Sequence, residues 1–313
     1  MATSGTTSFT TTRDEIIRDA ALEVSAIGLG VTMSAAMTQD FARVLNAMIK
    51  HWQGRGLHIW TVREATLFPV AGQARYAVGT GSTDHVAESV ARTTINADEA
   101  AGQSILSVTS TTGMAAGYQI GIKLDGGVMH WTTVVSTGAG TVTVTAALPS
   151  IASLGSLVFC YASNIPKPVR IVDARRQDIT SRIETPIQIV STQEYRWLPD
   201  KANAGSINQM QYEIQRAAGT INLWSVPSTL SELLTFTYWR PVEIFTAGGD
   251  NPDLPEEWAK TLKWNLALEL MGRYPVSPDR QQFISSMAAS SLFDMEGFSR
   301  EDTSVFFQPV YRR

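Results

Sequence analysis

The stretch LPEEWAKTLKWNLALELMGRY, residues 254–274, contains a strong helix signature. Pro255 followed by two glutamates is typical of a helix N-terminus, where acidic side chains face the positive end of the helix dipole. Apolar residues then recur every four positions, at Trp258, Leu262, Leu266 and Leu270. Trp264, Leu268 and Met271 add apolar side chains on other faces, so that nearly the whole circumference of the helix is apolar. Such a helix is expected at the centre of a core rather than on a surface.

Helical patterns also occur before and after this stretch. A further helix is expected directly after it, over 278–297. Near the N-terminus, Thr12 and Glu15 form a capping-box pattern before one helix, and a helix with an apolar stripe is expected over 34–54. Because terminal helices that bracket a β region must bury their stripes against one another, we expect a four-helix bundle.

The chain between these helices is typical of β structure. Residues 57–81 and 164–251 alternate apolar and polar side chains with a period of two, which indicates strands. Residues 82–163 differ in composition: between 101 and 163 only Lys123 and Asp125 are charged, and short strand patterns alternate with glycine turns. This pattern predicts a small all-β barrel or sandwich inserted into an antiparallel β domain.

The expected fold class is therefore α+β. The predicted organisation is an N-terminal arm (1–12), a helical bundle (13–56 and 252–298), a β domain (57–81 and 164–251), an inserted β module (82–163) and a C-terminal tail (299–313). The low charge of the inserted module, together with its own hydrophobic alternation, predicts that it folds independently.

Composition limits the function classes. The 313 residues contain 25 Lys+Arg and 29 Asp+Glu, a net charge of −4, which argues against wrapping nucleic acid with a basic surface. The single cysteine, Cys160, allows neither an intramolecular disulfide nor a multi-cysteine zinc site. No run approaches the ~18 apolar residues of a transmembrane helix, and the N-terminus lacks a signal pattern, so no membrane contact is expected.

Catalytic and cofactor patterns are equally weak. The sequence contains no phosphate-binding glycine loop, no H-E-x-x-H pair and no G-x-S-x-G turn. The four histidines are scattered, and Cys160 lies in an apolar strand pattern, where a buried structural thiol is the simplest interpretation. We therefore expect no catalytic residue, no cofactor, no metal and no enzymatic activity.

Two groups of residues are candidates for contacts with other chains. Arg170, Arg175 and Arg176 lie along one expected strand, as either a solvated edge or an inter-subunit or inter-domain salt-bridge face. The C-terminal tail is too aromatic for a solvated end, and it either folds back on its own helices or docks into a partner. Its candidate contact residues are Phe306, Phe307, Pro309, Tyr311, Arg312 and Arg313.

Several short segments, in order, resemble one known family. They are NAMIKHWQGRGLHIW at 46–60, LFPVAGQARY at 67–76, QEY at 193–195, LPDK at 198–201, NLWSVP at 222–227 and the helix at 254–274. No single segment is specific, but their order and spacing are similar to the tail tubular protein A and packaged-DNA-stabilisation group of head-to-tail adaptors in short-tailed phages. The inserted module and the C-terminal tail are the variable parts of this comparison.

The resemblance implies a structural virion protein that is made in the host cytoplasm and located at the head-tail interface. Such adaptors form a ring, commonly of twelve subunits, that binds the portal protein through a C-terminal extension, which implies portal contacts for the tail residues named above. The ring extends the DNA channel without sequence-specific binding and supports tail nozzle or tubular proteins, and in some cases tail fibres. It needs no cofactor.

Two alternatives remain open at this point. The first is another structural part of a phage tail, such as a nozzle or fibre-attachment protein. The second, from a different class, is a cell-wall or glycan hydrolase in which the Thr- and Gly-rich insertion acts as a binding module.

Overall fold

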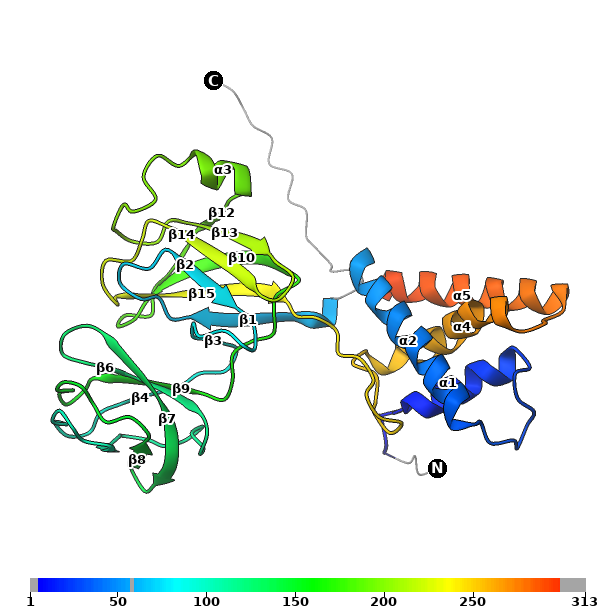
Figure 1. Ribbon diagram of the computed structural model, residues 1–313, viewed down its shortest axis with the longest axis horizontal. Coiled ribbons are helices and arrows are strands. Elements are labelled where there is room, and N and C mark those ends of the chain that lie inside the picture. Colours follow the sequence, from blue (N-terminus) through cyan, green and yellow to red (C-terminus); the bar gives the residue numbers. More distant parts are fainter. Residues whose placement is uncertain (1–4, 57–58, 299–313) are drawn as a thin grey trace. The chain divides into compact units, whose positions relative to one another are not determined.

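The computed structural model describes residues 5–56 and 59–298, and the chain divides into two compact units (Figure 1). Both chain ends contribute to one of them, Met1–Thr61 with Val242–Arg313, which we call the helical unit. The other, Val62–Pro241, consists almost entirely of strands and is called the β unit. The candidate tail residues, Phe306 to Arg313, lie outside the described residues, and their proposed contacts stay a prediction.

The helical unit contains α1 (Arg13–Glu23), α2 (Ala35–Arg55), α4 (Ala259–Leu270) and α5 (Pro278–Phe298), with short 3-10 turns at Ile59–Thr61, Glu256–Trp258 and Met271–Arg273. The capping box expected before α1 is present, since Thr12 and Glu15 each accept a hydrogen bond from the backbone of the other. Gly56 ends α2 in a left-handed conformation, with φ of 92°, which a residue with a Cβ atom adopts only at a cost.

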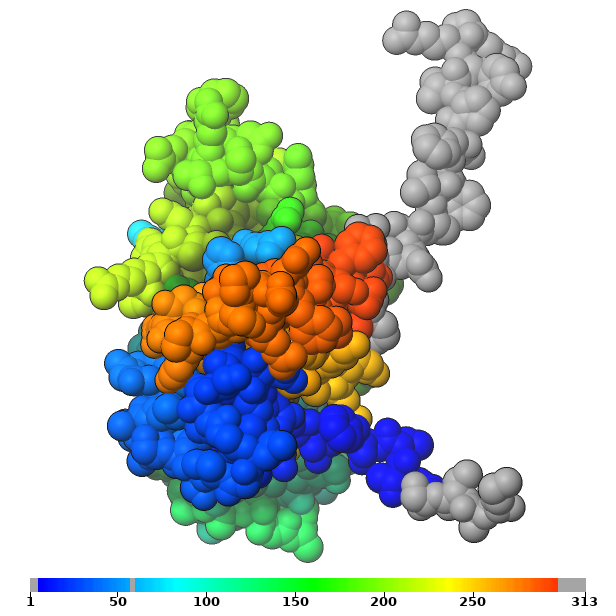
Figure 2. Space-filling view, turned by 90° about the vertical axis from the view of Figure 1, so that its right-hand side faces the viewer, coloured from blue at the N-terminus to red at the C-terminus, as the bar shows by residue number. Residues whose placement is uncertain are grey.

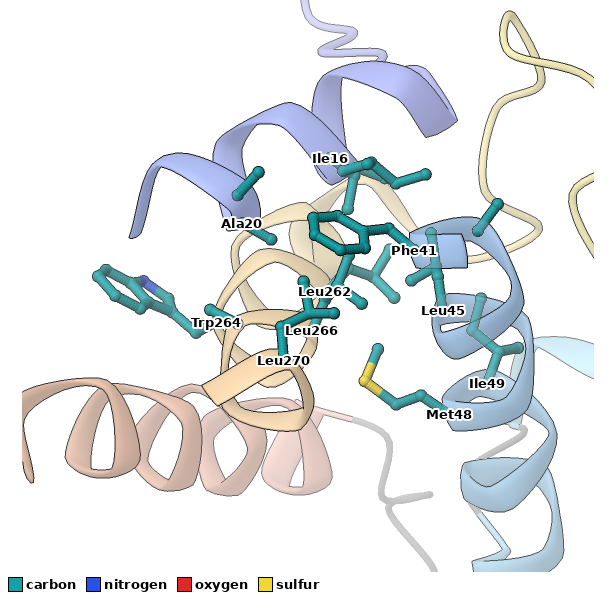
Figure 3. Packing of buried hydrophobic residues seen from close by; sticks show 14 of the residues in the cluster. Ile16, Ala20, Phe41, Leu45, Met48, Ile49, Leu262, Trp264, Leu266 and Leu270 are labelled. Carbon is teal, nitrogen blue, oxygen red and sulfur yellow. The ribbon is translucent and has the colours of Figure 1, made fainter. Parts of the chain in front are cut away.

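The expected terminal four-helix bundle is wrong. In Figure 3, α4 lies in the middle of the unit, with α1 and α5 on opposite sides of it and α2 to one side. The physical reason lies in α4 itself: seven of its residues are buried around its circumference, so three helices share it as a common core element. The helix α5 packs on α4 through a single buried face, which includes Ile284 and Ala288. The four helices therefore do not surround one shared centre as they would in a four-helix bundle.

Aromatic side chains from both chain ends fill this core. Trp258 is completely buried, and its ring centroid lies 5.6 Å from that of Trp52 and 5.2 Å from that of Trp60. Phe41 of α2 meets Tyr274 edge to face at 5.8 Å. The prediction that residues 254–274 form a central helix is confirmed, because α4 is the element on which the others pack.

Two sheets share a core in the β unit. The first has the strand order β11-β10-β15-β1-β3, all antiparallel, and the second the order β12-β13-β14-β2, in which only β12 and β13 are parallel. Buried residues of both sheets form one cluster that includes Leu67, Phe236, Tyr76 and Ile221. The bounds are β1 Val62–Leu67, β2 Arg75–Val78, β3 Val86–Ala87, β10 Arg170–Asp178, β11 Glu184–Pro186, β12 Gln188–Ile189, β13 Gln209–Ile214, β14 Gly219–Trp224 and β15 Glu232–Trp239, with the short helix α3 at Thr192–Trp197.

A third sheet, of six strands in the order β4-β9-β6-β7-β8-β5, is made by a contiguous part of the chain. Its strands are β4 Ala91–Thr94, β5 Ile105–Ser107, β6 Gln119–Lys123, β7 Met129–Gly138, β8 Thr141–Val144 and β9 Leu157–Tyr161. The sheet curls around its own core, and a bridge between Ile95 and Val108 links the chain just after its two edge strands. The chain is mostly β, with three sheets and only four longer helices. This finding further corrects the expected α+β class, in which the helical bundle had a larger share.

Candidate functional site

The candidate arginines of β10 have partners within the β unit. Arg175 of β10 forms ion pairs with Glu64 of β1 at 3.0 Å and with Glu184 of β11 at 3.1 Å. The guanidinium of Arg170 lies over the ring of Trp239, 5.3 Å from its centroid. These contacts stabilise the first sheet from within.

Arg176 joins the first sheet to the second. It donates hydrogen bonds to the carbonyl oxygen of Ile207 at 3.2 Å and to the side-chain oxygen of Asn208 at 3.0 Å, just before β13. It also lies 3.8 Å from the carboxylate of Glu232 in β15. The hypothesis that these arginines contact another subunit stays a prediction.

Most carboxylates with shifted pKa values belong to turns and helix caps. Hydrogen bonds from Ser153 lower the pKa of Asp125, and those from Ser181 and Thr180 lower the pKa of Asp178. The capping serine and threonine lower the pKa values of Glu194 and Glu15 in the same way. These carboxylates hold the backbone in shape, which accounts for their pKa shifts without a catalytic role.

Five aromatic side chains connect the third sheet to the first; we call Phe68, His85, Trp131, Phe159 and Tyr161 the aromatic junction. The ring of His85 stacks on that of Trp131 with centroids 3.8 Å apart. Its Nδ1 atom lies 2.6 Å from the hydroxyl oxygen of Tyr161. Burial lowers the pKa of His85 to about 4, although Asp84 opposes that shift, so the histidine is neutral at pH 7. The junction thus joins two parts of the β unit with an uncharged aromatic stack.

The remaining chemistry of the described residues is sparse. Burial raises the pKa of the Cys160 thiol to about 11, as expected for a structural cysteine. Across residues 5–56 and 59–298, no three His, Cys, Asp or Glu side chains lie close enough to hold a metal ion. A pocket of about 310 Å³ in the β unit is lined by Lys123 and Asp178, which end β6 and β10, and by loop residues that include Ser231. In the same described part of the chain, no helix is both long and apolar enough to cross a bilayer.

Large exposed apolar side chains are a feature that sequence patterns missed. In the helical unit, Phe293 of α5 is 73% exposed, and Leu29 and Val31 in the loop between α1 and α2 are 90% and 52% exposed. In the β unit, Trp197 at the end of α3 is 72% exposed. One signal was present in the sequence: residues 281–293, QQFISSMAASSLF, contain no charge, although more than half of them face solvent. Single exposed apolar side chains are common on protein surfaces, so these residues alone do not define a contact surface.

The segments that carry the family resemblance make hydrogen bonds to parts of the chain that are distant in sequence. The indole nitrogen of Trp60 donates to the carbonyl oxygen of Asp253 at 3.1 Å, and Asn46 exchanges two hydrogen bonds with the backbone of Phe245. In the β unit, the indole nitrogen of Trp224 donates to the carbonyl oxygen of Asp200 at 2.8 Å. The quoted residues are therefore structural contacts of the two cores.

No protein-family model matches the chain, and no curated protein matches it.

Proposed function

We propose that this chain is a structural subunit of a bacteriophage virion, a ring-forming head-to-tail adaptor that binds beneath the portal. In this role the ring extends the DNA channel and provides the platform on which the tail is built. DNA passes through without sequence-specific contacts, which agrees with a net charge of −4, because a lumen lined with Lys and Arg would bind phosphates and slow the duplex.

One observation carries the proposal: segments that resemble the adaptor family meet in space although they are far apart in the chain. Trp52 and Trp60 from the first motif pack on Trp258 from the last. The strand motif near the start of the β unit pairs with the NLWSVP motif, since the amide of Leu223 donates to Ala74 and that of Gly72 donates to Pro227. Residues that were matched only by order and spacing thus form shared cores, as expected if they define one family fold.

The exposed apolar residues support an assembly role. Phe293, Leu29 and Trp197 lie on different elements, and each is exposed to solvent in the single chain. In a ring each subunit meets two neighbours, and such contacts would remove exposed apolar side chains from water.

The direct test is to mix the purified chain with the portal protein of the same phage and image the particles by electron microscopy. We expect a closed ring of many copies attached to one end of the portal. Native mass measurement of the same sample supplies the copy number. A chain that stays monomeric and never associates with portals would overturn the proposal.

A matched variant locates the portal contact within this experiment. Deleting residues 303–313 removes Phe306 through Arg313 and leaves all described residues intact. We expect this shortened chain to fold and to lose portal binding. The full-length chain with Ile214→Ala, a change on the exposed surface of the β unit, serves as a control that keeps portal binding.

A further inference from the structure

The pocket of about 310 Å³ in the β unit lies where the third sheet meets loops of the first sheet. The third sheet contributes Lys123, at the end of β6, and residues 126–128 of the turn that follows it. The first sheet contributes residues 178–180, at and after the end of β10, and the loop 228–231 that leads into β15. The lining therefore comes from segments that are distant in sequence but belong to one compact unit.

Hydrogen bonds hold the walls of this pocket in place. The amide of Ile179 donates to the carbonyl oxygen of Ser231 at 2.9 Å, and the amide of Gly127 donates to that of Leu124 at 2.9 Å. Arg92 of β4 donates to the carbonyl oxygen of Ile179, which ties the third sheet to the end of β10. Walls that are fixed before a ligand arrives lose little conformational entropy when it binds.

Several polar groups in the lining are available to a ligand. The ammonium of Lys123 and the hydroxyls of Thr180 and Ser228 form no hydrogen bond or ion pair with any described residue. In Asp178, Oδ1 accepts hydrogen bonds from the amides of Thr180 and Ser181 and from the hydroxyl of Ser181, at 2.6–2.9 Å, whereas Oδ2 accepts none from the described residues. The pocket thus offers donors and one acceptor to the same ligand.

The two charges in the pocket have opposite signs. Of the described residues that line it, only Lys123 and Asp178 are charged. Hydrogen bonds from Ser181 and Thr180 lower the pKa of Asp178, and the nearby charge of Lys123 adds to that shift, although the two side chains form no ion pair. A ligand with a net charge of either sign would be attracted by one group and repelled by the other. A neutral ligand that both donates and accepts hydrogen bonds can satisfy both.

The position of Lys123 in the sequence supports a binding role for its charge. Between residues 101 and 163 the only other charged residue is Asp125. The carboxylate of Asp125 accepts hydrogen bonds from the amide and the hydroxyl of Ser153, so its charge stabilises a turn. The ammonium of Lys123 has no comparable structural partner among the described residues, and it lines the pocket.

The size of the pocket and its apolar part limit the ligand further. Small-molecule sites usually measure about 300–1,000 Å³ and are lined mainly by apolar and aromatic side chains. This pocket is at the lower end of that range, and none of its described lining residues is aromatic. Its larger apolar side chains are Val128, Ile179 and Leu230. A small ligand with many polar groups and a limited apolar surface therefore fits best.

We infer that this pocket binds a neutral, polyhydroxylated ligand, namely a single saccharide unit. Each hydroxyl of a sugar both donates and accepts hydrogen bonds, so one can accept from Lys123 while its neighbour donates to Oδ2 of Asp178. The hydroxyls of Thr180 and Ser228 add further partners, and Leu230 offers an apolar contact for the carbon-bound hydrogens of the ring. This activity goes beyond the adaptor role and does not depend on it.

Titration of the full chain with small molecules tests the inference. The neutral probes are glucose, galactose, mannose and N-acetylglucosamine, and inorganic phosphate is the charged probe. We expect saturation-transfer NMR and calorimetry to detect at least one neutral sugar with a dissociation constant of about 1 mM or lower, and no binding of phosphate. Binding of phosphate in place of the sugars would overturn the inference, and so would the failure of every sugar to bind.

A disaccharide of the sugar that binds separates two sources of the same chemistry. Tighter binding than that of the monosaccharide supports a glycan chain as the ligand, because the pocket would then hold one unit of the chain. Weaker binding supports the free sugar.

Two variants test whether the sugar occupies this pocket. Lys123→Met removes the ammonium and keeps an unbranched side chain, and should weaken binding about tenfold or more, because a hydrogen bond from a charged donor is lost. Ser228→Trp places a large ring at an exposed lining position and should abolish binding. Both variants should keep the melting temperature of the unmodified chain. Unchanged sugar binding in both would overturn the inference.

The helical unit, whose helices α1, α2 and α5 are seen in Figure 2, supplies a matched control. Lys260 of α4 is exposed and lies outside the pocket, so Lys260→Met makes the same chemical change elsewhere. We expect this control to bind the sugar as the unmodified chain does. Equal losses in Lys123→Met and Lys260→Met would show a general effect of charge and overturn the assignment of the pocket.

Discussion

The helical unit and the third sheet of the β unit are built in opposite ways. In the helical unit, Asn46 bonds to Phe245 and Trp60 bonds to Asp253, so its contacts join parts of the chain about two hundred residues apart. In the third sheet, β6 pairs with β7 and β7 pairs with β8, each its neighbour in sequence, and the longer pairing of β4 with β9 joins residues at most 69 positions apart, Ala91 and Cys160. Closing a long loop costs conformational entropy before any contact stabilises it, whereas hairpins form locally. The helical unit therefore depends on the few large side chains that join the two chain ends.

Charge is distributed in the same contrasting way. In the helical unit, Glu23 of α1 pairs with Lys263 of α4 at 3.2 Å and with Arg280 of α5, so ion pairs also connect the chain ends. The third sheet has almost no charge from 101 to 163 and is held by backbone pairing and apolar packing. The two regions should accordingly respond differently to mutation and to pH.

The largest effect is expected at the contact between the chain ends. Trp258→Ala removes a completely buried ring that touches Trp52 and Trp60, and should lower the free energy of unfolding by about 3–5 kcal/mol. Denaturation followed by far-ultraviolet circular dichroism should show helix lost before strand. As a control, Trp197→Ala at an exposed site should change stability by less than about 0.5 kcal/mol. Simultaneous loss of helix and strand would contradict the separate stability of the two units.

A smaller effect is expected at the aromatic junction, where pH changes the charge of His85. Burial lowers its pKa from 6.5 to about 4. Between these two pH values, His85 is therefore protonated in the unfolded chain and neutral in the folded chain. Stability from this residue is complete above pH 6.5 and is lost as the pH falls toward 4. Because the ring is partly exposed, we expect a loss of roughly 1–2 kcal/mol, measured as unfolding free energy against pH.

The matched variant His85→Phe keeps a ring against Trp131 and removes the titrating group. The other groups are shared by both proteins, so the difference between their curves reports His85 together with its electrostatic interaction with Asp84. We expect the variant to lose less stability than the unmodified chain between pH 6.5 and 4. Parallel curves would show that protonation of His85 does not affect folding.

The smallest effect compares two helices with the same cap. Thr12 of α1 and Ser191 of α3 each form a complete capping box, but α1 contributes four buried residues and α3 none. Thr12→Ala should cost about 1 kcal/mol of global stability, whereas Ser191→Ala should cost less and increase amide exchange only in α3. Urea midpoints and hydrogen exchange measure both effects. Equal global losses would mean that α3 is coupled to the core more tightly than its exposed position implies.

Local patterns predicted the individual elements well. The capping box at Thr12, the helix over 34–54 and the central helix beginning near Pro255 all depend on side chains within a few residues of one another. The glycine-punctuated alternation between 101 and 163 likewise produced strands, because hairpins need only neighbouring residues. The strand β3, inside the predicted insertion 82–163, pairs with β1 instead of joining the third sheet, which no local pattern indicated.

The sequence by itself determined where helices and strands form, which residues cap them and which classes of site lack a recognisable pattern. Only the tertiary structure decided that α4 takes three neighbours in place of a four-helix bundle, that Arg176 ties two sheets together, and that Phe293 is left exposed. The physical reason is that periodicity reports whether a side chain is apolar, but burial depends on which distant surface arrives to cover it. Ile284 and Phe293 are both apolar residues of one helix, and packing against α4 buries the first and not the second.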